Sequence, residues 1–146
     1  SIVIEDGILE SNFIFQNSGS TNILLNDNYK WILDLECNFS QLKIDASELE
    51  ISKLDLDSAF HSGDIYISEP VGEVDIGIDS ALSDLVIYIP SDSEYKVISS
   101  KGLAILRIDD ALYKEGLYKS SGYEEATDRY NINVDIGLGK VEIKEY

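Results

Sequence analysis

The stretch LDLDSAFHSGDIYISEPVGEVDIGIDSALSDLVIYIP, residues 54–90, decides the fold. Apolar residues alternate with polar ones in four short groups, and residues typical of turns separate the groups. Alternation of this kind places the apolar side chains on one face of a β-strand. The apolar members of the groups are therefore predicted to form the core: Leu54, Leu56, Ile65, Ile67, Val74, Ile76, Leu85, Ile87 and Ile89.

The spacing of the groups limits how the strands are connected. Including an earlier pair, Leu42 and Ile44, successive groups start 9–12 residues apart. A helical crossover alone takes a dozen or more residues, so the strands form either an antiparallel meander or a solenoid of stacked turns. Intervening apolar residues such as Phe60, Val71 and Leu82 are predicted to form another wall of a coil, which favours the solenoid. We therefore predict an all-β, solenoid-like stack of short strands.

The chain is predicted to form one domain over residues 1–146. Its 44% hydrophobic residues are enough for a core without disulfides or metals. We expect N-terminal capping strands over 1–40, a repeat core over 41–108, and a surface excursion over 109–131 that its tyrosines pin to the sheet. Residues 132–146 are expected to close the chain as a strand, a glycine-containing turn and a final strand near one end of the stack.

The charge of the chain excludes several classes of partner. The sequence has 28 acidic and 11 basic residues, and its formal net charge is −17. Such a surface repels nucleic-acid phosphates and anionic lipid headgroups, so we expect neither as a partner. No apolar run approaches the roughly 20 residues of a membrane helix, so membrane attachment is expected only through segments outside this sequence. The charge is typical of a soluble protein, and it also suits a cationic partner or bound cations.

The sequence predicts no catalytic, cofactor-binding or metal-binding residue, and hence no enzyme. Asp55 and Asp75 alternate with core residues, so they are expected to point into water, where a carboxylate is a poor general acid. His61, the only histidine, is interpreted as a loop residue, and Cys37, the only cysteine, as a buried, inert thiol. The repeated glycine–aspartate turns that bind calcium in solenoids are absent, and Gly137-Leu138-Gly139 is interpreted as a turn.

Three outward-facing side chains form a candidate contact surface: Tyr66, Val86 and Tyr88. Tyrosine is favoured at protein interfaces, which supports a functional interpretation. The alternative is structural. If residues 76–78 pair with residues 87–89, Tyr88 covers Gly77 and replaces the packing that a glycine lacks. The sequence leaves both interpretations open.

The last third of the chain carries a resemblance to a known domain. Its order is Gly116-Leu117-Tyr118, then Gly122-Tyr123-Glu124-Glu125-Ala126, then Arg129 and the run Val134-Asp135-Ile136-Gly137-Leu138-Gly139-Lys140-Val141-Glu142-Ile143. This order resembles the C-terminus of the toast-rack β domain of LiaF-like cell-envelope stress proteins and of related domains of unknown function called "putative adhesins". The segment DIGID…LVIYIP over 75–90 resembles the middle of that domain, and the similarity covers roughly residues 40–146.

The resemblance implies a right-handed β-helix-like, two-sheet prism that is fused to membrane helices in the full-length protein. It also implies a regulatory or scaffolding role at the bacterial cell envelope, and it supplies no catalytic residues. We therefore expect a non-enzymatic, membrane-tethered regulator or scaffold that acts through protein–protein contacts, with a membrane signalling protein as a candidate partner. The alternatives are an adhesin or glycan-binding module at the cell surface and, third, a carbohydrate-active enzyme.

The two ends of the predicted stack need to be covered. Leu42 and Ile44 are expected near one end, and Val141 and Ile143 near the other. An uncovered end exposes unpaired backbone groups and invites pairing with another chain. We therefore expect either a cap formed by residues 1–40 or a homodimer through a stack end.

Overall fold

The computed structural model describes an all-β chain. It covers residues 2–4, 10–15, 23–25, 27–100, 103–108, 111–113 and 116–146, and within these ranges the chain forms eleven strands and no helix. Accordingly, the described residues contain no helix long and apolar enough to cross a membrane. The strands are β1 (Ile2–Ile4), β2 (Glu10–Phe15), β3 (Ile23–Leu25), β4 (Lys30–Ala46), β5 (Glu50–Ile67), β6 (Glu73–Ile89), β7 (Glu94–Ser99), β8 (Leu103–Ile108), β9 (Ala111–Tyr113), β10 (Gly116–Lys119) and β11 (Arg129–Glu145).

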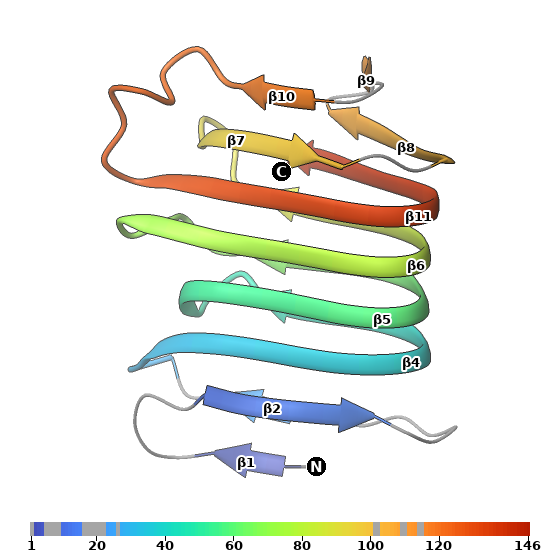
Figure 1. The fold of residues 1–146 in the computed structure, drawn as a ribbon. Coiled ribbons are helices and arrows are strands. Elements are labelled where there is room, and N and C mark those ends of the chain that lie inside the picture. Colours follow the sequence, from blue (N-terminus) through green and yellow to red (C-terminus); the bar gives the residue numbers. More distant parts are fainter. Residues whose placement is uncertain are drawn as a thin grey trace.

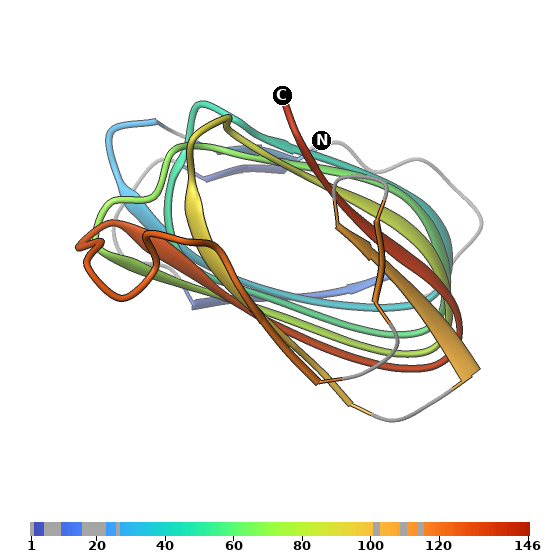
Figure 2. The same ribbon diagram turned by 90° about the horizontal axis from the view of Figure 1, so that it is seen from above.

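Four strands of 17 or 18 residues, β4, β5, β6 and β11, lie parallel and in register above one another (Figure 1). They belong to one nine-stranded sheet in the order β10-β7-β11-β6-β5-β4-β2, with β8 beside β11 and β9 beside β8. Each long strand bends at its middle and follows both sides of a flattened oval (Figure 2). The first wall contains residues 30–37, 50–58, 73–80 and 129–136 with β2 and β7, and the second wall contains residues 41–46, 62–67, 84–89 and 140–145 with β8.

One full turn of the chain is longer than the spacing that the sequence suggests. Leu33 pairs with Leu54, and Leu54 pairs with Ile76, so a turn takes 21–22 residues. The sequence suggests that each alternating group is a separate short strand. In the structure, two successive groups are instead the two arms of one long strand, with one arm on each wall. The alternation is the same on both arms because both arms face the same interior.

The structural alternative, in which Tyr88 covers Gly77, does not occur. Both residues lie on β6, with Gly77 on the first wall and Tyr88 on the second. Tyr88 pairs with Tyr66 of β5, whereas Gly77 pairs with Asp55. The predicted pairing needs a turn between residues 78 and 87, and the strand is continuous there.

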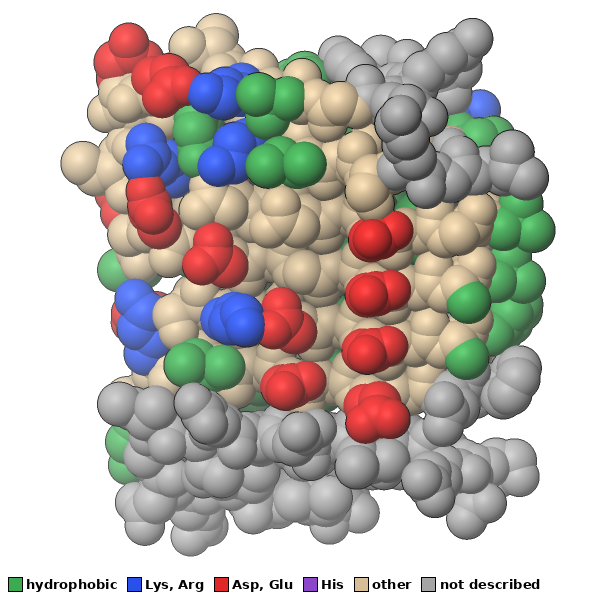
Figure 3. All heavy atoms as spheres, viewed as in Figure 1, with side chains coloured by type: hydrophobic (Ala, Val, Ile, Leu, Met, Phe, Trp, Pro, Cys, Tyr) green, Lys and Arg blue, Asp and Glu red, His purple; other side chains and the backbone are tan. Residues whose placement is uncertain are grey.

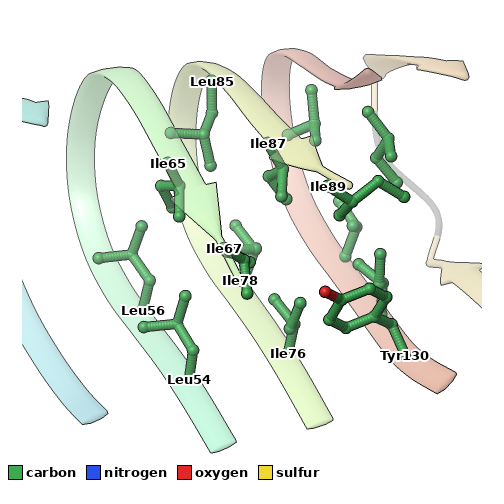
Figure 4. Packing of buried hydrophobic residues seen from close by; sticks show 14 of the residues in the cluster. Leu54, Leu56, Ile65, Ile67, Ile76, Ile78, Leu85, Ile87, Ile89 and Tyr130 are labelled. Atoms are coloured by element: carbon green, nitrogen blue, oxygen red, sulfur yellow. The ribbon is translucent and has the colours of Figure 1, made fainter. Parts of the chain in front are cut away.

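The interior between the two walls is apolar (Figure 4). All nine residues predicted for the core are buried, and Cys37 is buried as predicted. Inward-facing columns repeat the same type of side chain from strand to strand, as in Leu33, Leu54, Ile76, Ile132 and Val97. Each fully buried aliphatic side chain contributes about 1.5–3 kcal/mol, so these columns supply much of the driving force for folding.

The residues predicted to form short strands on another wall of a coil do not form separate strands. Phe60, which is 41% exposed, and Leu82, which is half-buried, pair with each other at the bend between the two walls. Val71 is 51% exposed and precedes β6. The prediction of separate strands is wrong because β5 and β6 continue through the bend that contains Phe60 and Leu82.

β11 is the last strand in the sequence, yet it lies inside the sheet. It pairs with β6 on one side and with β7 and β8 on the other. The prediction of a final strand near a stack end is therefore wrong, and Val141 and Ile143 are buried between neighbouring strands. Gly137-Leu138-Gly139 is also not a turn but the bend of one continuous strand. Gly139 has a φ of 120°, and a Cβ there would overlap the carbonyl oxygen of Ser83, so the bend requires glycine.

The segment between β8 and β11 adds two short strands. β10 pairs antiparallel with β7 on the first wall, and β9 pairs antiparallel with β8. Tyr123 and Tyr130 are buried, and the ring of Tyr118 lies 5.4 Å from that of Tyr95, so these tyrosines hold the segment against the sheet. The side chain of Tyr113 lies outside the described residues. At the other end of the sheet β2 pairs parallel with β4, and β1 pairs separately with β3.

A candidate binding face on the first wall

A column of four acidic side chains runs across the strands on the outer surface of the first wall (Figure 3). All four are exposed, and each pairs in register with the next. Neighbouring strands lie about 4.8 Å apart, and like charges directly opposite one another are destabilising. We call this set the acidic column: Glu36, Asp57, Asp79 and Asp135.

A second column lies two residues earlier on the same strands. We call it the mixed column: Asp34, Asp55, Gly77, Asn133 and, on β7, Ile98. Its acids are partly neutralised, because Lys53 Nζ lies 2.5 Å from Asp55 Oδ2 and this hydrogen bond raises the pKa of Lys53. Gly77 leaves room for the neighbouring carboxylate, since a Cβ at residue 77 would lie 2.5 Å from Asp55 Oδ1.

A groove of about 490 Å³ runs between the two columns. The acidic column from Asp57 to Asp135 forms one side, and the mixed column from Asp34 to Ile98 forms the other. The groove therefore crosses the strands instead of following one of them. Residues two apart on a strand are roughly 7 Å apart, and a helix with its side chains is about 10–12 Å wide. The groove thus admits side chains and excludes the backbone of a helix.

The end of the groove next to β7 and β10 is apolar. Ile98 is 42% exposed and lines the groove, and Leu117, which is 60% exposed, pairs with it across the two strands. The nearby ammonium groups of Lys96 and Lys119 lie over the Tyr123 ring, 5.3 and 5.4 Å from its centroid. Lys119 also forms an ion pair with Glu124. These bases are therefore drawn toward Tyr123, and the groove ends in an exposed apolar pair, Ile98 and Leu117.

On the second wall, Glu142 and Asp84 are paired with lysines. Glu142 lies 3.1 Å from Lys144 and 3.3 Å from Lys140, and Lys140 also lies 3.3 Å from Asp84. The hydrogen bond from Lys144, together with that from Lys140, lowers the pKa of Glu142. In the part of the chain that the structure describes, no lysine or arginine forms an ion pair with the acidic column. Among the described residues, the acidic column therefore differs from Glu142 and Asp84, and also from Glu50, Asp55 and Glu73 on its own wall, which all pair with bases.

The predicted contact residues Tyr66, Val86 and Tyr88 lie on the second wall and are half-buried. The rings of Tyr66 and Tyr88 stack with centroids 4.4 Å apart and planes 4° apart, and Tyr146 meets Tyr66 edge-on at 5.9 Å. Burial, with Tyr66 as a further cause, raises the pKa of Tyr88. Each ring covers a face of the other, so this arrangement stabilises the sheet. A contact role for the three residues stays a prediction.

The other residues considered for chemistry do not converge on one site. Asp75 is exposed and Asp55 is half-exposed, which agrees with their predicted outward orientation. The interpretation of His61 as a loop residue is wrong, because His61 lies within β5; its side chain is outside the described residues. Among the described side chains, no group of three or more His, Cys, Asp or Glu is placed to hold a metal ion. The acidic column is thus a row of separate carboxylates.

The acidic column was not predicted from the sequence, because it depends on the register between turns. Each of its acids stands between two inward-facing neighbours, and this local signal is visible in the sequence. A turn of 21–22 residues aligns Glu36, Asp57 and Asp79. Asp135 pairs with Asp79 only because β11 inserts beside β6, and no spacing rule predicts that step.

The fold is similar to that of a solved structure, described as a "putative cell adhesion protein" from Clostridium sporogenes ATCC 15579. The TM-score is 0.75 at 20% sequence identity, and the match covers 88% of this chain and 66% of that chain. The present chain therefore spans just under two thirds of that protein's length. No protein-family model matches the chain, and no curated protein matches it at a significant level. At this identity the likeness shows a shared fold, and a fold alone does not define a function.

Proposed function

We propose that the chain is a non-enzymatic contact domain of an adhesin-type protein at the bacterial cell surface, and that it acts by binding another protein. The observation that carries the proposal is the outer face of the first wall. It combines a groove, an exposed apolar pair and a column of acids without ion-pair partners among the described residues. Like charges in register cost stability, so a face that retains them is typical of a binding surface.

The architecture suits this role. Binding side chains on strands are held more firmly than side chains on loops, and here the acidic column stands on long strands that are each paired on either side. The C. sporogenes protein is described as a "putative cell adhesion protein", which supports an adhesin-type function for this chain. The two proteins share 20% of their residues, so the partner of one need not be the partner of the other.

The finer architecture and location are part of the proposal. We interpret the stacked turns as a right-handed, solenoid-like domain of the toast-rack type, supported by the resemblance of residues 116–143 to that family. In this interpretation, segments outside this sequence tether the full-length protein to the cell envelope. The same resemblance favours a second candidate, an envelope-associated regulator or scaffold. Both candidates require a protein partner, so one experiment addresses them together.

Glycan binding through the predicted contact residues is less favoured. A sugar ring that packs on an aromatic side chain needs an open ring face. Tyr66 and Tyr88 cover one another at 4.4 Å, and Tyr146 approaches Tyr66 from a further side. Each stacked ring therefore has one of its two faces covered by the other ring.

The test is site-specific photo-crosslinking in the full-length protein on the cell that produces it. A crosslinking residue replaces Ile98 on the first wall or Tyr66 or Tyr88 on the second, and the exposed loop residue Asp92 is the control position. We expect a defined protein adduct from at least one wall and none from position 92. The absence of protein adducts from both walls, or adducts with glycan alone, contradicts the proposal.

A further inference from the structure

We propose that the groove of the first wall binds a basic amphipathic helix of a partner protein. A row of lysine or arginine side chains lies along the acidic column, and an apolar side chain of the helix packs on Ile98 and Leu117. The inference rests on the proposed function, because it assigns a surface and a chemical class of partner to the contact domain.

The acidic column provides the charge complementarity. Its carboxylates are exposed and repel one another along the sheet. A partner that brings one base to each carboxylate removes this repulsion and adds an ion pair at every strand. A second copy of the chain does not fit the face, because the chain carries a net charge of −17 and its copy would bring the same acids to the contact.

The spacing of the acidic column favours a helix over an extended segment. Four carboxylates on neighbouring strands span about 14 Å at about 4.8 Å per strand. Four side chains at one-turn intervals on a helix span about 16 Å at about 5.4 Å per turn. Four same-face side chains on a β-strand span about 20 Å. The mismatch is about 2 Å for the helix and about 6 Å for the strand, and flexible lysine side chains absorb the smaller one.

The groove accommodates the side chains of such a helix. Its floor is strand backbone at Leu56, Ile78 and Val134, and its volume is about 490 Å³. Because the groove is too narrow for the helix itself, the helix lies over the opening of the groove and parallel to it. Lysine and arginine bury their apolar stems while they keep the charge at the surface. The stems therefore pack along the groove, and the charged groups reach the acidic column.

The apolar pair determines the direction in which the partner helix lies on the first wall. Leu117 and Ile98 are large, exposed and adjacent. Lys96 and Lys119 stand at the same end of the first wall, so a base of the partner is repelled there and an apolar side chain is favoured. The partner helix therefore carries its bases toward β4 and its apolar anchor toward β10.

The test uses a fluorescent synthetic helix of about four turns as the probe. Lysines follow one face at one-turn intervals, and a leucine lies one turn beyond the last lysine. A second peptide of the same composition distributes the lysines around the helix. Fluorescence anisotropy measures the binding of both peptides to the whole chain at low and at physiological ionic strength.

Two triple variants with the same change in charge test the acidic column. The first is Asp57→Asn, Asp79→Asn and Asp135→Asn. The matched control is Glu48→Gln, Asp64→Asn and Asp92→Asn, which neutralises three acids away from the first wall. Leu117→Ser tests the apolar pair. Urea denaturation of each variant confirms that it folds before binding is compared.

We expect the first triple variant to weaken binding of the one-faced peptide about tenfold, and Leu117→Ser to weaken it about threefold. The control variant should stay within about twofold of the parent, and added salt should weaken binding throughout. Equal losses in the two triple variants, equal binding of the two peptides, or no binding at all would overturn the inference. Crosslinks from Tyr66 or Tyr88 without any from Ile98 would also overturn it and would leave the proposed function standing.

Discussion

Replacing Ile132 with alanine tests the position of β11 inside the sheet. Ile132 is fully buried and pairs with Ile76 of β6 on one side and with Val97 of β7 on the other. The change removes roughly three methylene equivalents at about 0.8 kcal/mol each, or about 2.4 kcal/mol of transfer free energy. The cavity left between two paired strands adds to this, so we expect the free energy of unfolding to fall by about 3–4 kcal/mol. That loss is a large part of the roughly 5–15 kcal/mol that stabilises a typical domain.

The assay is urea denaturation followed by the fluorescence of Trp31, the only tryptophan, which is fully buried in β4. Leu138→Ala on the same strand is the matched control, because Leu138 lies at the bend and is 49% exposed. We expect this control to cost less than about 1 kcal/mol. A loss below about 1 kcal/mol for Ile132→Ala, or equal losses for both variants, would refute the reasoning that places β11 between β6 and β7.

Three further substitutions test local features. Gly139→Ala is expected to lower the free energy of unfolding more than Gly116→Ala. The two glycines have similar φ angles, 120° and 117°, but of the two only a Cβ at residue 139 would overlap a neighbouring strand. Equal urea midpoints for the two variants would contradict this. Glu142→Gln is expected to destabilise the chain most above pH 4.5, because the lowered pKa of Glu142 gives stability that is lost as the pH falls further; a loss that does not shrink in acid would contradict it. Tyr130→Phe is expected to cost about 1–2 kcal/mol, because the buried hydroxyl donates to the Ser68 carbonyl oxygen; an unchanged melting temperature would argue against that hydrogen bond.

The core was predictable because its signal is local. Ile65 and Ile87 alternate with polar residues over a few positions, and any strand pairing that buries one face places them inside. The end of β6 was predictable for a similar reason, since Pro90 follows Ile89 and cannot donate a hydrogen bond to a neighbouring strand. These features depend on a strand and its own side chains, whatever the strand pairs with.

The register and the order of the strands were not predictable in this way. Period-two alternation is identical on both walls, so a half-turn and a full turn give the same pattern at Leu54 and Ile65. The position of β11 depends on contacts between residues far apart in the chain, such as Ile132 with Ile76. The acidic column was hard to predict for the same two reasons, the register and the position of β11. Its members are visible one by one, but their alignment exists only once the register is known.

The alignment of the acidic column indicates more about function than the net charge does. An acidic chain that needs only solubility gains most from acids that are dispersed, because dispersal limits repulsion. On the second wall, Glu142 is balanced by Lys140 and Lys144. On the first wall, acids occupy the same outward position on four neighbouring strands, which concentrates the repulsion along one line. A cationic partner removes that repulsion on binding, so the feature that lowers the stability of the free chain increases its affinity for such a partner.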